Sequence, residues 1–193
     1  MVIAHITDTH IPGAGEATHT DAEPATNLVR VLQHASQRCA GILITGDCAA
    51  VAGTDSEYAA FAEIVRAATV PVWLAPGNHD DARKMQRLFD VPSRDSRCDY
   101  IVELPATRLI VLDSTREGRE DGALSGSQLE WLDSQLNDTP AVVREHQSTT
   151  DRIDGHVERA DTVLQSIVGQ HVPLTGRVLD HDGPTVVILE HER

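Results

Sequence analysis

The chain has 193 residues, of which 40% are hydrophobic and 24% charged, as is typical of one soluble globular domain. Its 16 basic and 30 acidic residues give a formal net charge of −14, which disfavours binding to a nucleic-acid polymer or to an anionic membrane surface. Two Trp, two Tyr and two Phe offer little surface for stacking on bases. We therefore expect a single domain over residues 1–193 whose partner is a small molecule. The sequence gives no indication of oligomeric state.

The three cysteines and the N-terminal segment bear on where the protein works. Cys39, Cys48 and Cys98 are odd in number and lack Cys-x-x-Cys spacing, which argues against a disulfide framework and a zinc ribbon. The first residues show no basic segment followed by an apolar one, and no apolar run approaches the roughly 20 residues of a membrane span. These features predict a protein of the reducing cytoplasm.

Short apolar runs alternate with amphipathic segments in the first part of the chain. Strands are predicted at residues 2–6, 41–45 and 70–74, because each run is rich in Ile, Val and Leu and ends in polar residues. Helical spacing of apolar residues predicts helices around 28–35 and 58–65, the second preceded by a capping box, Thr54-x-x-Glu57. This alternation predicts an α/β fold with a largely parallel sheet covered by helices.

The second part of the chain is richer in strands. They are predicted at residues 100–103, 109–112, 141–144, 171–174 and 185–189. A helix is predicted to begin at a second capping box, Ser125-x-x-Gln128, and another to span residues 160–168. The polar loop 11–23 directly follows the first strand, which is a place where loops often carry or cover a site.

Polar residues follow three of the predicted strands. Asp8 and His10 come after the first, Asp47 after the second, and Asn78 and His79 after the third. Neighbouring parallel strands would bring these residues to one edge of the sheet, and residues two apart in an extended segment point the same way. Carboxylate, imidazole and amide donors suit Mn, Fe, Zn or Co better than Ca or Mg. The pattern therefore predicts a site for one or two divalent ions, with a carboxylate such as Asp47 able to bridge two of them.

Two groups of motifs resemble a known family. The metal-site motifs resemble the signature of the calcineurin-like metallophosphoesterases: Asp8-x-His10, Gly46-Asp47 and Gly77-Asn78-His79-Asp80. The middle of the chain resembles the bacterial class III cyclic-nucleotide phosphodiesterase branch: Arg108-Leu-Ile-Val-Leu-Asp113-Ser114, Gly122-Ala-Leu-Ser, and Gln128-Leu-Glu-Trp131-Leu132. The resemblance covers residues 1 to about 146 well and the remainder loosely.

The resemblance implies a fold, a reaction and a role for each site residue. The family fold is a two-sheet β-sandwich flanked by helices, with layers in the order α/β/β/α. Asp8 and His10 would bind the first metal ion, Asp47 would bridge both ions, and Asn78 would bind the second. A metal-bound hydroxide would attack phosphorus in a phosphodiester, such as a 3′,5′-cyclic nucleotide, or in a phosphomonoester. His79 would protonate the leaving group, and the partner would be a small-molecule phosphate ester, a nucleotide by preference.

The downstream motifs depart from those of the family. In place of His-His-Pro-Pro the chain has His146 followed by Gln-Ser-Thr, and His146 is carried over as a ligand of the second metal ion. In place of Gly-His-x-His it has Gly-Arg-Val-Leu around Arg177, so both histidines are absent. The sequence leaves open whether Arg177 acts as a cationic clamp on phosphate or is a solvent-facing residue. It also leaves open whether His156, Glu158 or His181 replaces the missing ligands or lies in a loop without that role.

Two functions of different classes follow from this comparison of motifs. The first is a metal-dependent phosphoric ester hydrolase, which the three intact N-terminal motifs favour. The alternative is a degenerate metallophosphoesterase that binds a metal ion or a phosphate ligand without turnover, which the missing Gly-His-x-His favours.

Overall fold

A computed structural model describes residues 2–16, 23–105 and 108–137. In chain order its elements are β1 (Ile3–Thr7), α1 (Pro24–Ser36), β2 (Gly41–Thr45), α2 (Asp55–Val65), β3 (Val72–Ala75), α3 (Ala82–Leu88), β4 (Tyr100–Glu103), β5 (Arg108–Val111) and α4 (Gly126–Asn137). Every strand and helix predicted within these ranges is present, with strand ends shifted by one or two residues at most. The predicted elements at 141–144, 160–168, 171–174 and 185–189 lie outside the described residues.

The first three strands form a parallel sheet with β2 in the middle. All five residues of β2 are buried, as expected for a parallel strand that is covered on both faces and reads as a continuous apolar run. The register pairs Thr45 with Thr7 of β1 and with Ala75 of β3. The three strands therefore end at the same level, and the loops that follow them begin side by side.

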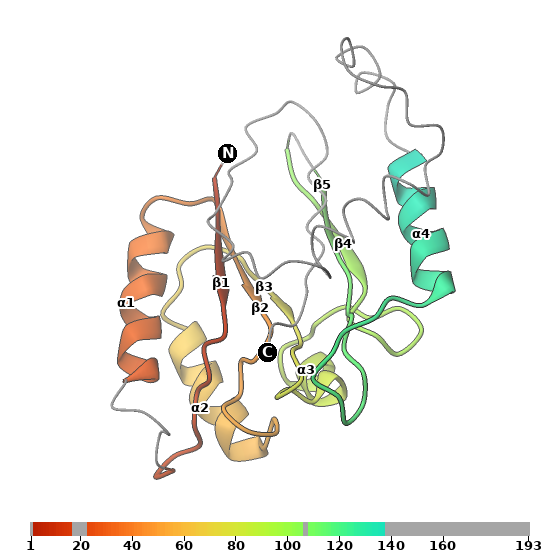
Figure 1. Cartoon of the computed structure of the whole chain (residues 1–193). Coiled ribbons are helices and arrows are strands. Elements are labelled where there is room, and N and C mark those ends of the chain that lie inside the picture. The colour runs from red at the N-terminus through yellow and green to blue at the C-terminus, as the bar shows by residue number, and fades with distance from the viewer. Residues whose placement is uncertain (1, 17–22, 106–107, 138–193) are drawn as a thin grey trace.

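Helices α1 and α2 lie on one side of the parallel sheet, and β4 and β5 lie on the other (Figure 1). Leu28 and Leu32 of α1 and Phe61 of α2 are buried in the main core. The capping box predicted for α2 is confirmed, because the Thr54 hydroxyl accepts the Glu57 N–H at 3.2 Å and the Glu57 carboxylate accepts the Thr54 N–H at 2.7 Å.

The antiparallel pair β4–β5 forms the second sheet. Each face of this sheet packs in a different apolar cluster. Leu109 and Val111 belong to the main core, whereas Ile110 packs in a second cluster with Leu132 of α4. Alternation along a strand accounts for this division, since successive side chains point to opposite faces. The layers therefore run helices, parallel sheet, antiparallel sheet, helix (Figure 1), and the predicted α/β/β/α sandwich is confirmed.

A tyrosine hydroxyl ties the two sheets together. The Tyr100 hydroxyl of β4 donates to the backbone carbonyl of Leu74 in β3 at 2.8 Å and accepts the Leu74 N–H at 3.1 Å. Both groups of Leu74 are thereby satisfied where β3 has no further strand beside it among the described residues. The hydroxyl thus satisfies buried backbone groups that would otherwise be costly.

Helix α3 has no counterpart among the predicted elements. It has only seven residues, of which Met85 is buried while Leu88 is 56% exposed, so it lacks an apolar stripe. Its start is nevertheless marked in the sequence, because the Asp81 side chain caps the helix by accepting the Lys84 N–H at 3.0 Å. In the described ranges none of the helices is long and apolar enough to cross a lipid bilayer.

Candidate metal centre

The loops after β1 and β2 continue the pairing of their strands. The Asp8 N–H donates to the Gly46 carbonyl at 3.2 Å, and the His10 N–H donates to the Asp47 carbonyl at 2.8 Å. A third bond of the same kind, at 3.0 Å, joins Ile11 to Cys48. The two loops therefore lie against each other and place the side chains of Asp8, His10 and Asp47 at the same edge of the sheet.

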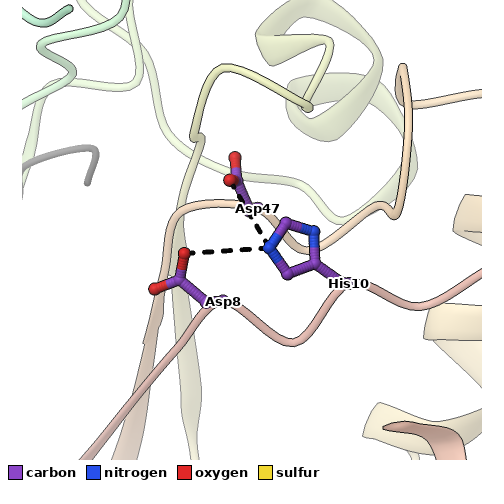
Figure 2. A group of neighbouring side chains, drawn as sticks. All are labelled: Asp8, His10 and Asp47. Atoms are coloured by element: carbon purple, nitrogen blue, oxygen red, sulfur yellow. Dashed lines mark ion pairs between the residues drawn. The ribbon is translucent and has the colours of Figure 1, made fainter. Parts of the chain in front are cut away.

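These three side chains converge on one point (Figure 2). The Nε2 atom of His10 lies 3.8 Å from an Asp8 carboxylate oxygen and 3.7 Å from an Asp47 carboxylate oxygen. One donor atom from each residue lies within 4.8 Å of the other two. Both distances from His10 are shorter than the roughly 4.2 Å that can separate two atoms bound to one ion at about 2.1 Å each. Asp47 is buried, with its side chain 4% exposed, while Asp8 and His10 are 38% and 42% exposed. The donor set therefore fits a divalent cation that is reached from solvent.

The backbone at these residues is not the extended one assumed from the sequence. Asp8, His10 and Asp47 have φ angles of 54°, 43° and 47°, in the left-handed region that residues other than glycine seldom adopt. The assumption that Asp8 and His10 point the same way along an extended strand was therefore wrong. The two side chains converge because the chain turns at each of them.

The loop after β3 supports Asp47 from the other side. The His79 N–H donates to the Asp47 carboxylate at 3.0 Å, while the other oxygen of that carboxylate faces His10. A Cβ at Gly77 would lie 2.3 Å from both the backbone N and a carboxylate oxygen of Asp47, so only glycine allows this approach. Asn78 lies half-buried between Gly77 and His79.

The imidazole of His79 lies beside the cluster and is held by a hydrogen bond at Nδ1. Its ring centroid is 5.1 Å from that of His10, with the two rings edge to face. The Nδ1 atom of His79 is 2.8 Å from the Ala50 carbonyl oxygen. Because a carbonyl can only accept a hydrogen bond, Nδ1 carries the proton, and Nε2 is the atom left to exchange a proton with a ligand.

Asp80 joins two of the loops and has a role that the sequence did not indicate. Its carboxylate accepts the backbone N–H groups of Gly77 at 2.9 Å and of Cys48 and Ala49 at 3.0 Å each. It also accepts the Tyr58 hydroxyl at 3.2 Å. Burial raises the pKa of Asp80 to about 6, although the three N–H donors act in the opposite direction. Its place at the end of Gly-Asn-His-Asp was the signal available for it.

The motif residues in the middle of the chain form a buried network that joins β4, β5 and α4. The Asp113 N–H donates to the Asp99 carboxylate at 2.8 Å, and the Cys98 N–H donates to the Asp113 carboxylate at 3.2 Å. The Gln128 side chain donates to both the Asp99 carboxylate and the Asp113 carbonyl. These residues therefore hold the second sheet to α4, and they do not belong to the Asp8, His10 and Asp47 cluster.

Several residues named from the sequence fall beyond the part of the chain that the structure describes. His146, the predicted ligand of a second metal ion, is one of them. Arg177, His156, Glu158 and His181, the candidates for replacing the missing histidines, are the others.

Comparison with known proteins agrees with this arrangement. The sequence profile of the calcineurin-like phosphoesterases matches residues 1–192. A protein of Arcobacter nitrofigilis described as a probable glycerophosphodiester phosphodiesterase is 32% identical over 146 residues, which cover 72% of this chain and 53% of that protein. The 3′,5′-cyclic adenosine monophosphate phosphodiesterase of Escherichia coli K12 is 34% identical over 146 residues, covering 72% and 50%. The chain thus spans about half the length of these relatives.

A solved structure supports the same fold. Purple acid phosphatase from yellow lupin superposes with a TM-score of 0.53 at 17% identity, covering 72% of this chain and 28% of that one. At such low identity the likeness concerns the fold alone, and that fold is the sandwich described above. Since the family profile extends over nearly all of the sequence, the chain belongs to the calcineurin-like phosphoesterase family.

Proposed function

We propose that this chain is a metal-dependent hydrolase of small phosphodiesters, with 3′,5′-cyclic nucleotides as the preferred class. The observation that carries the proposal is the convergence of donor atoms from Asp8, His10 and Asp47 within 4.8 Å of one another, with the His79 ring beside them. The substrate class is supported by relatives named as phosphodiesterases, including a probable cyclic nucleotide phosphodiesterase of Fibrobacter succinogenes that is 31% identical over 138 residues.

The proposed ligands divide between two metal positions. Asp8 and His10 would hold the first ion, and Asn78 and His146 would contribute to the second. Asp47 would be shared by both ions, since one oxygen of its carboxylate faces His10 and the other accepts the N–H of His79 in the loop that carries Asn78. Mn, Fe, Zn or Co suits this mixture of oxygen and nitrogen donors. Such ions supply Lewis acidity to the phosphoryl group and make water a better nucleophile at neutral pH.

His79 is proposed as the proton donor to the leaving group. In hydrolysis a water oxygen forms a new bond to phosphorus while the bond from phosphorus to the leaving oxygen breaks. That oxygen takes up a proton, which a protonated His79 delivers from Nε2 and later regains from water. The bond from Nδ1 to the Ala50 carbonyl fixes the ring for this step.

The net charge of −14 means that bound metal ions would also be needed to attract an anionic substrate. A negatively charged protein repels an anionic phosphate ester at long range. Bound divalent ions are the largest local charges in such a site, and they reverse the sign of the field where the phosphate binds.

The proposal is tested with the full chain stripped of metal by a chelator and then reloaded with Mn²⁺. Hydrolysis of bis(p-nitrophenyl) phosphate and metal content are measured on the wild type and on Asp47→Asn. We expect turnover that depends on Mn²⁺ and is lost in Asp47→Asn. The matched control is Asp90→Asn, which makes the same change at an exposed aspartate whose φ of 52° is close to that of Asp47. It should keep full activity.

Two other outcomes would contradict the proposal in different ways. A wild type that binds Mn²⁺ through Asp47 but hydrolyses neither bis(p-nitrophenyl) phosphate nor a cyclic nucleotide would be a binding module. A wild type that binds no metal would show that the cluster of Asp8, His10 and Asp47 is not a metal centre.

A further inference from the structure

We propose that Glu57 is a positioning residue for His79 and acts through the peptide group that joins Ala50 to Val51. Glu57 lies on α2, outside the three motifs that supply the metal site. The inference rests on the proposed role of His79 as proton donor. It names the structure that keeps a proton on Nδ1 and so leaves Nε2 to take up and release the transferred proton.

Two hydrogen bonds run through this one peptide group. The Glu57 carboxylate accepts the Val51 N–H at 2.6 Å, and the Ala50 carbonyl accepts Nδ1–H of His79 at 2.8 Å. The two backbone groups are opposite ends of the same planar unit. A continuous path of hydrogen bonds therefore leads from the carboxylate to the imidazole.

The orientation of this peptide group decides which nitrogen of the neutral His79 ring carries the proton. As it stands, a carbonyl faces Nδ1, so Nδ1 must donate and Nε2 is left for the substrate. If the peptide group rotated by half a turn, an N–H would face Nδ1 instead. Nδ1 would then have to accept, and the neutral ring would carry its proton on Nε2.

Glu57 holds the peptide group in the first orientation. Its side chain is fully buried, with 0% of the residue exposed, and it is fixed by further bonds from the Thr54 N–H at 2.7 Å and the Ala52 N–H at 3.4 Å. A charge at the N–H end of a peptide group also strengthens the acceptor at its carbonyl end, since hydrogen bonds in a chain polarise one another. On the other side, the Ala50 N–H donates to the Ile11 carbonyl at 3.1 Å.

The surroundings of Glu57 keep its carboxylate in the charged form that this role requires. Burial by itself would raise the pKa of Glu57. The hydrogen bonds from the backbone and side chain of Thr54 and from the N–H groups of Val51 and Ala52 outweigh burial, so the pKa lies below its ordinary value.

The first experiment observes the ring of His79 directly in the metal-free full chain. Histidine nitrogens are labelled with ¹⁵N, the spectrum is recorded where the ring is neutral, and the signal of His79 is assigned by its loss in His79→Gln. We expect the wild type to hold the proton on Nδ1, and Glu57→Gln to give a mixture of both forms. A wild type with the proton on Nε2 would overturn the proposal, whether or not the variant folds.

The second experiment separates positioning from stability by the choice of leaving group. Cyclic nucleotides release an alkoxide, which needs a proton, whereas bis(p-nitrophenyl) phosphate releases a phenolate, which does not. We expect Glu57→Gln to lower kcat about tenfold on the cyclic nucleotide and less than about twofold on the phenolate ester. The matched control is Thr54→Ala, which removes the hydroxyl that caps α2 at Glu57 but keeps the carboxylate on Val51.

The outcomes distinguish this inference from the proposed function. Thr54→Ala should lower the free energy of unfolding. Any change in its kcat should be the same on both substrates, and the proton of the neutral His79 ring should stay on Nδ1. Equal losses on both substrates in Glu57→Gln would overturn the positioning role. A wild type inactive on both substrates would overturn the proposed function, and the ¹⁵N measurement would still decide whether Glu57 sets the form of His79.

Discussion

At the scale of single residues, Gly77 shows how little space the site allows. A Cβ there would lie 2.3 Å from Asp47, so Gly77→Ala must displace either loop. We expect a loss of about 1–3 kcal/mol in the free energy of unfolding, as in other overpacked positions, together with weaker Mn²⁺ binding because Asp47 moves. Urea unfolding and a metal titration measure both effects.

The same substitution elsewhere serves as its control. At Gly126, the first residue of α4, a Cβ would meet no atom within 4 Å. Gly126→Ala should therefore raise the free energy of unfolding by about 0.4–1 kcal/mol, because alanine has less freedom to lose on folding. If Gly77→Ala behaved in the same way, the close approach of Gly77 to Asp47 would be wrong.

The residues that carry side-chain chemistry could be named from the sequence, whereas those that act through the backbone could not. Asp8, His10, Asp47 and His79 stand in short motifs after apolar runs, and the structure brings them together. The left-handed φ angles of Asp8, His10 and Asp47 were not foreseen, since periodicity reports only which residues are apolar. The contact of His79 with the Ala50 carbonyl depends on the path of a whole loop, which no local pattern encodes.

At the scale of elements, the network between β4, β5 and α4 contains a buried carboxylate, Asp99, whose charged form is unfavourable there. Asp99 is buried, and one of its oxygens has no hydrogen-bond partner within the described ranges. Burial raises the pKa of Asp99 above its ordinary 3.8, and the nearby Asp113 carboxylate adds to this, while bonds from Asp113 N–H and Gln128 and the charge of Arg97 oppose it. The folded state therefore holds the Asp99 proton more tightly than the unfolded state.

This difference predicts how stability depends on pH. The stabilisation from protonated Asp99 is present below about pH 3.8 and is lost as the pH rises through the raised pKa of the folded state. Asp99→Asn keeps a side-chain oxygen as acceptor but carries no charge at any pH. We expect its free energy of unfolding to rise relative to the wild type between about pH 3 and pH 7. Urea unfolding of both proteins across this range tests it, and a difference that does not change with pH would contradict it.

Elements with a strong local signal were predictable, and the one without such a signal was not. The two capping boxes, which begin at Thr54 and Ser125, can each be recognised from four consecutive residues. They lie at the start of α2 and α4, as predicted. Helix α3 is short and buries little, so its apolar spacing carries no information. Only the capping residue Asp81 marks it.

At the scale of the whole molecule, metal binding and folding stability are coupled. Because the proposed ligands come from loops after separate strands, they come together only in the folded state. Free Mn²⁺ at 100 times its dissociation constant should raise the free energy of unfolding by about 2.7 kcal/mol. Thermal unfolding with Mn²⁺ and with a chelator measures this. The wild type should respond and Asp47→Asn should not, whereas equal responses would place the ion elsewhere.

The overall arrangement was only partly contained in local sequence patterns. Alternating strands and helices predicted the parallel sheet, because adjacent parallel strands are the usual outcome of that alternation. The packing of β4 and β5 against it as a second sheet came from the resemblance to the family. Local patterns could not supply it, since contacts such as that of Tyr100 with Leu74 join segments far apart in the chain.

The left-handed backbone at Asp8, His10 and Asp47 has a consequence for how this protein would respond to selection. Glycine adopts that conformation freely, whereas other residues pay about 1–2 kcal/mol for it. A variant library sorted only for abundance of folded protein should therefore enrich glycine at all three positions. The same library sorted for hydrolysis should keep the two aspartates and the histidine. The positions at which the two sorted populations disagree would map the proposed metal centre from sequencing counts alone.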